Sequence, residues 1–194
     1  MKHLKQTLLV TLLASVAALA QVDIIDFSKS SGSSKFGIHA GLGLGGFNHA
    51  NQLEKTLDNE IKLVASIGGL FMLPVSNAVN FVPEALITYA AMPGEKSSDV
   101  RIDIPALLRF YPLVATYFQI GPQLGLSLNS KGDDGKSHDK RNSFEIGPVF
   151  GLGYQIDADM SIDIRYFYSV AKYFDYNGAS AQSYQLLVGI SYLF

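Results

Sequence analysis

Residues 100–111 read VRIDIPALLRFY, and this stretch decides the fold class. Its even-numbered positions are apolar from Ile102 to Phe110, whereas Arg101, Asp103 and Arg109 occupy odd-numbered positions. Alternation with a period of two indicates a β-strand with one apolar face, because a helix needs a period of 3.6. The stretch is also longer than the strands of about 5–6 residues usual in soluble proteins. It is long enough to cross a bilayer, which takes about 9–11 tilted residues.

The same alternation recurs along the chain in segments of similar length. Eight segments carry it: 36–47, 60–73, 81–92, 100–111, 117–128, 143–155, 160–168 and 183–194. In the first, glycines alternate with aliphatic residues, which relieves crowding inside a narrow barrel. The length of the segments argues against a soluble sandwich. The sequence therefore predicts an all-β fold, an eight-stranded antiparallel up-and-down transmembrane β-barrel over residues 35–194.

The connections between these segments alternate in length. Polar, mostly long connections are expected at 48–59, 93–99, 129–142 and 169–182, and shorter ones at 74–80, 112–116 and 156–159. Long loops at one end and tight turns at the other are typical of outer-membrane barrels. We therefore expect both termini on the periplasmic side and the long loops outside.

The two faces of the strands differ in composition, and this difference indicates which face meets lipid and which faces the lumen. One parity is aliphatic with Tyr and Phe near the strand ends, as expected of a lipid-facing belt. The other carries mixed charges, which we expect to form a lumen charge network: Glu84, Arg101, Asp103, Arg109, Glu145, Asp163 and Arg165. Such a set could be a conduction path or a salt-bridged plug. The narrow interior of an eight-stranded barrel favours the plug, because buried charges must be paired.

Four prolines fall inside predicted strands, at Pro83, Pro105, Gly121-Pro122 and Gly147-Pro148. Proline cannot donate a ladder hydrogen bond, so it normally marks an edge or a bulge. Because a closed barrel has no edge, we expect β-bulges at some of these sites.

The N-terminus has the three parts of a secretory signal peptide. A basic start at Lys2, His3 and Lys5 precedes an apolar run and the small residues before Gln21. We predict a signal peptide over 1–20 with cleavage after Ala20, followed by a flexible periplasmic lead-in over 21–34. A membrane anchor fits less well, since the apolar run is about 12 residues and a spanning helix needs about 20.

Composition excludes several classes of protein. The formal net charge is −2, which gives no basic patch for nucleic acid, and there is no cysteine for a disulfide, a thiolate metal site or lipidation. None of His3, His39, His49 and His138 has a serine two residues on, as a strand-borne lipid deacylase would require. His138-Asp139 is a weak match to a membrane protease. We expect no catalytic residue, no cofactor, no cofactor-binding site and no metal site.

Motifs on several predicted strands resemble one family, in the right order. Pro83-Glu84, Asp103 to Tyr111 (DIPALLRFY), Gly121 to Gly125 (GPQLG), Gly147 to Tyr154 (GPVFGLGY) and Asp163 to Tyr166 resemble the third to seventh strands of the PorT-like outer-membrane β-barrel family. The resemblance covers most of 35–194, with Asp103 and Arg109 in place of the commoner Glu and Lys. It implies an eight-stranded outer-membrane barrel and no shared enzymatic activity.

The chain ends in Tyr192-Leu193-Phe194, which is similar to the aromatic terminus of many outer-membrane barrels. The resemblance implies that Tyr192 and Phe194 form a C-terminal assembly signal for the barrel assembly machinery. We also expect the protein to be a monomer surrounded by outer-membrane lipid. We expect no nucleic-acid partner, and the sequence does not identify an external ligand.

Three functions remain open on sequence alone. The first is a non-enzymatic barrel with a structural role or a role in binding or adhesion through its loops. The second is a narrow channel for small solutes, and the third is a soluble ligand-binding barrel.

Overall fold

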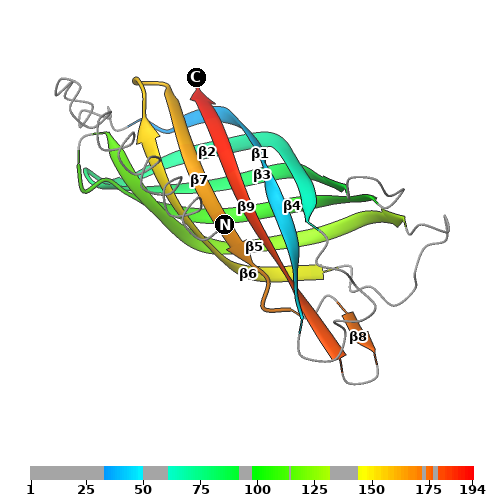
Figure 1. Ribbon diagram of the computed structural model, residues 1–194. Helices are drawn as coiled ribbons and strands as arrows, with labels where there is room; N and C mark the ends of the chain where they lie inside the picture. The colour runs from blue at the N-terminus through cyan, green and yellow to red at the C-terminus, as the bar shows by residue number, and fades with distance from the viewer. Residues whose placement is uncertain are drawn as a thin grey trace, which may run out of the picture.

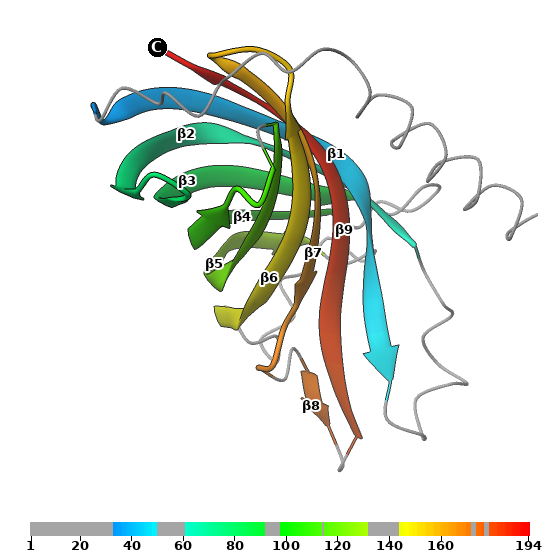
Figure 2. The same cartoon turned by 90° about the vertical axis from the view of Figure 1, so that its left-hand side faces the viewer.

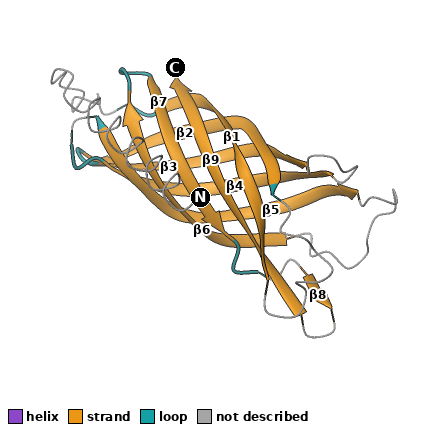
Figure 3. Cartoon of the chain, viewed as in Figure 1, coloured by secondary structure: helices purple, strands orange, loops and turns teal. Residues whose placement is uncertain are grey.

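A computed structural model describes residues 33–49, 61–91, 98–113, 115–131, 144–171, 174–176 and 179–194. These ranges contain nine strands and, as Figure 3 shows, no helix. The strands are β1 (Lys35–His49), β2 (Lys62–Ser76), β3 (Val79–Ala91), β4 (Ser98–Phe110), β5 (Thr116–Lys131), β6 (Phe144–Gln155), β7 (Met160–Tyr168), β8 (Phe174–Tyr176) and β9 (Ala179–Leu193). In the ranges described, no helix is long and apolar enough to cross a membrane.

Eight of these strands close into a barrel. Each pairs antiparallel with its neighbour from β1 to β7, then β7 pairs with β9, and β9 pairs with β1 to close the sheet. Figures 1 and 2 show the strands wrapped around one lumen, with β8 as a short appendage beside β9 at one end. The predicted fold, a closed eight-stranded antiparallel β-barrel, is confirmed.

The outer surface of the barrel is aliphatic. On neighbouring strands Leu42, Ile67 and Ile87 have 70%, 62% and 59% of their surface exposed. Residues of the opposite parity are buried, as the alternating burial of β3 and β4 shows. The alternation read from the sequence therefore places the apolar residues outside and most of the charged residues of the strands inside.

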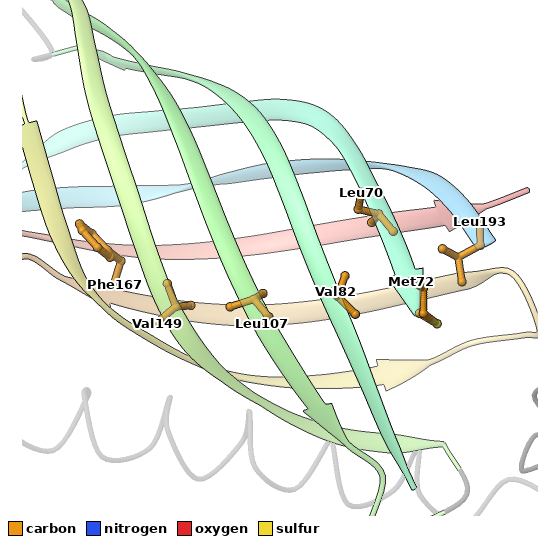
Figure 4. Packing of buried hydrophobic residues seen from close by; sticks show 7 residues of the cluster. All are labelled: Leu70, Met72, Val82, Leu107, Val149, Phe167 and Leu193. Carbon is orange, nitrogen blue, oxygen red and sulfur yellow. The ribbon is translucent and has the colours of Figure 1, made fainter. Parts of the chain in front are cut away.

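One sector of the lumen is apolar and lies beside the charged residues. Seven buried side chains from six strands lie together there: Leu70, Met72, Val82, Leu107, Val149, Phe167 and Leu193. Figure 4 shows them lying in a band across the strands inside the barrel. They fill space that the charged side chains do not occupy.

The strands are mostly longer than predicted. β9 begins four residues earlier than expected and β5 ends three residues later, while β7 has the predicted bounds. β8 lies inside the predicted connection 169–182, and Asp99 belongs to β4 rather than to a loop. The predicted signal peptide over 1–20, most of the lead-in and much of the long loops, with His138, lie outside the described residues.

The prediction of bulges at the strand prolines is wrong. Pairing keeps one register past Pro83, Pro105 and Pro122, and Pro122 lies opposite Pro148. The register shifts fall elsewhere, between Pro74 and Ser76 and between Val100 and Arg101.

Glycines beside two of the prolines explain the unbroken register. A Cβ on Gly121 would overlap the carbonyl oxygen of Ala106, and a Cβ on Gly147 would overlap that of Tyr168. Neighbouring backbones therefore approach closely at both Gly-Pro steps. Because glycine permits that approach, the sheet coils here without an extra residue in either strand.

The short connections and the C-terminus lie at the same end of the barrel, which we call the turn end. The backbone N–H of Leu193 donates to the carbonyl of Asp159 at 2.7 Å, and that of Phe194 donates to the carbonyl of Phe36 at 2.7 Å. Lys35 Nζ lies 2.8 Å from Asp159 Oδ1. The opposite end of the barrel, at which β1, β3, β5 and β7 end and β2, β4, β6 and β9 begin, is called the loop end.

Candidate functional site

The seven charged residues singled out by the sequence all lie inside the barrel, on the buried parity of their strands. Each has at most 5% of its surface exposed: Glu84 3%, Arg101 5%, Asp103 3%, Arg109 1%, Glu145 4%, Asp163 2% and Arg165 4%. They come from β3, β4, β6 and β7. They form two groups, one toward each end of the lumen.

The turn-end cluster consists of Glu84, Arg109, Asp163 and Arg165. The Arg165 guanidinium donates to both oxygens of Glu84, at 2.5 Å to Oε2 and 3.0 Å to Oε1. Its Nε also donates to Asp163 Oδ1 at 2.7 Å. Arg109 Nη2 reaches Glu84 Oε1 at 3.4 Å. Two cations thus face two carboxylates, so the cluster is neutral overall.

The Glu84–Arg165 pair crosses the lumen. Glu84 is on β3 and Arg165 is on β7, with three strands between them in the sheet order. A two-pronged contact between guanidinium and carboxylate is among the stronger and more directional side-chain interactions. The pair therefore ties opposite walls of the barrel together and fills the middle of the lumen.

His39 packs against the same cluster from β1. Its Nδ1 lies 3.0 Å from Ser191 Oγ and 3.3 Å from Arg165 Nη2. Because a guanidinium only donates, Nδ1 accepts, and the neutral ring carries its proton on Nε2. The imidazole lies over the paired Gly41 and Gly189, and a Cβ on Gly189 would overlap ring atom Cε1. Glycine in these two strands makes room for the ring.

Tyr117 closes the lumen at the turn end. Its side chain is fully buried, and the guanidinium carbon of Arg109 lies 4.9 Å from its ring centroid. Its hydroxyl lies 3.4 Å from Ser161 Oγ and 3.4 Å from Asp163 Oδ2. On the neighbouring strand a Cβ at Gly153 would overlap the ring. The phenol thus fills the space that a side chain at Gly153 would need.

The loop-end cluster is built around Arg101. Its Nε donates to Asp103 at 3.1 Å and its Nη1 donates to Glu145 Oε2 at 2.8 Å. Thr88 Oγ1 donates to Asp103 Oδ2 at 2.6 Å. Asp99 completes the group, with Oδ1 accepting from Ser127 Oγ at 2.5 Å. This loop-end cluster has three carboxylates and one arginine, whereas the turn-end cluster has equal numbers of both.

Comparison with solved structures gives the fold a context. Neisserial surface protein A matches with a TM-score of 0.59 at 15% identity, over 84% of this chain and 99% of that one. The fold is that of a small outer-membrane barrel. Ail, the attachment invasion locus protein of Yersinia pestis, matches with a TM-score of 0.48 at 14% identity, over 82% of this chain and 99% of that one.

A third neighbour is the outer membrane protein OprG of Pseudomonas aeruginosa, with a TM-score of 0.46 at 12% identity, over 84% of this chain and 96% of that one. No protein-family model matches the chain, and no curated protein sequence matches it either. At these identities the structural neighbours establish the fold and no more.

Sequence reasoning missed several interior residues. The sequence places Asp99 in a loop because the predicted strand begins two residues too late, although Asp99 shares the parity of Arg101 and Asp103. Tyr117 was treated as a strand end, yet it is among the most buried side chains. Gln119 accepts from Arg109 Nε at 3.1 Å, and only its inward parity could have indicated this.

The terminal aromatic residues lie on the outside of the barrel at the turn end. Tyr192 is 46% exposed and Phe194 is 66% exposed, with ring centroids 5.4 Å apart. Phe36 stacks against Phe194 with ring centroids 6.3 Å apart. These rings lie at the end of the aliphatic belt, where aromatic residues of membrane barrels gather.

Within the described ranges, no group of three or more His, Asp or Glu side chains is placed to hold a metal ion. The buried carboxylates are instead engaged mainly by arginines. This arrangement is suited to holding the walls of the barrel in register and to filling its lumen.

Proposed function

We propose that this protein is a non-enzymatic integral outer-membrane barrel whose own charged side chains plug the lumen, and whose long loops serve a structural, binding or adhesive role. The observation that carries the proposal is the Glu84–Arg165 pair, which crosses the lumen with both residues at most 4% exposed. A barrel of eight strands has an interior just wide enough for its own side chains. Because the lumen is filled, we assign the role of the protein to its long loops.

The location in the outer membrane is supported by the aliphatic outer surface and by the outer-membrane neighbours. We propose that the turn end and both termini face the periplasm, since short turns lie on that side in such barrels. In that orientation, Tyr192 and Phe194 would be the part of the chain that the assembly machinery reads. We expect outer-membrane lipid to surround a single copy of the barrel.

We also propose that the chain is a distant PorT-like barrel. The ordered motifs support this, since they fall on the consecutive strands β3 to β7. They also supply five residues of the lumen charge network: Glu84, Asp103, Arg109, Asp163 and Arg165. Alignment of homologues tests the idea, because related chains should keep an acid at position 84 together with a base at position 165.

Planar-bilayer recording tests the closed lumen. We expect the reconstituted protein to give no discrete conductance steps, because the Glu84–Arg165 pair fills the lumen. The double variant Glu84→Ser, Arg165→Ser keeps the net charge but removes both long side chains, so it should conduct. Discrete openings by the unmodified barrel that vanish when Arg109 or Arg165 is neutralised would contradict the proposal and favour a narrow channel.

A further inference from the structure

A buried histidine, His39 on β1, packs against the turn-end cluster but is not needed for its charge balance. Its side chain has only 1% of its surface exposed. The two arginines of the cluster already balance its two carboxylates, so a filled lumen needs no imidazole. Histidine is the side chain whose charge changes most readily between pH 5 and 8. The protonation state of His39 therefore decides the net charge of this part of the lumen.

Charged groups face the imidazole from three strands, and their charges cancel. They are Asp163 and Arg165 from β7, Glu84 from β3 and Arg109 from β4. On the flanking strands, the residues paired with His39 are Gly68 on β2 and Ser191 on β9, and neither is charged. The cluster is thus neutral only while the ring is neutral, and a proton on the ring would give it a formal charge of +1.

The hydrogen bonds of the ring also require the neutral form. Nδ1 lies 3.3 Å from Arg165 Nη2, and a guanidinium carries only donors. The lone pair of Nδ1 therefore accepts from Arg165, and a proton would occupy that lone pair. Two N–H donors on two positively charged groups would then face each other. Ser191 Oγ, at 3.0 Å from Nδ1, could accept from the new N–H, but the two like charges would remain side by side.

The nearby carboxylates do not offset this repulsion. Asp163 Oδ2 is 4.0 Å from Nδ1, which is farther than the guanidinium nitrogen at 3.3 Å. The same carboxylate oxygen already accepts from Arg165 Nη2 at 3.0 Å. Glu84 is likewise engaged by Arg165 through both oxygens. A proton on His39 thus adds an uncompensated positive charge in a place that water hardly reaches, which is costly.

We propose that His39 is an acid-sensitive switch of the turn-end cluster. Nδ1 takes up one proton from water, the proton on Nε2 stays in place, and the hydrogen bond from Arg165 is lost. The guanidinium is then repelled from the ring, which weakens the side-chain contacts that join β1, β3 and β7. Acid therefore loosens the folded barrel. This inference goes beyond the proposed function, because a filled lumen needs no group that titrates.

Urea unfolding of the protein in lipid vesicles at pH 7.5 and at pH 5.5 tests the proposal. In the unfolded chain, a histidine has a pKa of about 6.5 and takes up a proton over this range. The unfolded state then binds more protons than the folded state, so stability falls as the pH falls. We expect the equilibrium constant for unfolding to rise about tenfold between the two pH values. Carboxyl groups contribute little over this range, because their ordinary pKa values are about 4.

Two variants assign the effect to His39. His39→Asn can present an amide oxygen to Arg165 in place of Nδ1 but cannot take up a proton, so the pH dependence should disappear. In the second variant, His3, His49 and His138 are all replaced by glutamine, which leaves His39 as the only histidine of the chain. This matched control keeps the turn-end cluster intact, so the tenfold pH dependence should remain.

The proposal is wrong if the variant with His39 as its only histidine unfolds equally readily at both pH values. It is also wrong if His39→Asn keeps the pH dependence of the unmodified protein. If His39→Asn does not fold, the variant with His39 alone decides the matter by itself. The closed lumen would be untouched by either result, because conductance tests it separately.

Discussion

Replacing Glu84 by glutamine will destabilise the folded barrel by about 3–5 kcal/mol, the usual cost of breaking a buried ion pair from one side. Glu84 accepts from Arg165 through both oxygens and is also contacted by Arg109. Without its charge, the turn-end cluster keeps two arginines and the single carboxylate of Asp163. The buried positive charge left behind causes the loss, more than the loss of the hydrogen bonds.

Urea unfolding of the protein reconstituted in lipid vesicles measures this effect. The double variant Glu84→Gln, Arg109→Gln restores neutrality and leaves the Asp163–Arg165 contact in place, so it should lose less than the two single variants combined. Asp157→Asn, in an exposed turn, is the control for removal of an acidic charge and should change little. A loss of less than about 1 kcal/mol for Glu84→Gln would mean that water reaches the cluster.

Arginine at position 67 will also destabilise the barrel, by about 2–4 kcal/mol in a lipid bilayer, as expected for a charge near the middle of the hydrocarbon. Ile67 lies midway along β2 with 62% of its surface exposed. It is flanked by Ala40 on β1 and Ile87 on β3, so its surroundings on the outer face are apolar. A soluble barrel would tolerate the same change, because arginine would point into water.

Val75→Arg provides the control near the end of the same strand. Val75 is equally exposed, at 64%, but lies beside the turn between β2 and β3. Near the interface an arginine costs only about 0–1 kcal/mol. Unfolding of both variants from the same vesicles gives the comparison, and equal losses at positions 67 and 75 would contradict a membrane-spanning outer face.

The sequence was sufficient to predict the fold because the alternation of apolar residues with a period of two repeats in every barrel strand. In β4 the even-numbered positions from Val100 to Phe110 are apolar and all the charged residues are at odd-numbered positions, so a slip of one residue would turn every side chain to the wrong face. Parity therefore predicted which residues face the lumen, Glu84 and Arg165 among them. The ends of the strands were less predictable, since β9 and β5 continue into polar sequence that reads as loop.

The pairing inside the lumen could not be predicted from the sequence. Glu84 and Arg165 are 81 residues apart and meet because the closed sheet brings β3 and β7 to face each other. Which arginine reaches which carboxylate depends on the stagger of the strands around the barrel, and no local pattern encodes that. For the same reason the division into two clusters, one neutral and one acidic, emerged only from the structure.

The prolines show where a general rule gave the wrong expectation. Proline in a paired strand usually indicates a bulge, but the register passes unchanged through Pro122 and Pro148. Here the preceding glycines let the neighbouring backbone come close, and the sheet coils instead. Sequence alone does not distinguish these two ways of accommodating a proline.

Electrophoresis of unboiled membrane fractions tests the central claim, a closed membrane-spanning barrel, most directly. We expect the protein to be released from outer-membrane fractions only by detergent and to run as a faster band when unboiled than when boiled, because a closed barrel resists unfolding in the gel. A protein that is soluble without detergent and gives a single band at one position under both conditions would contradict this account.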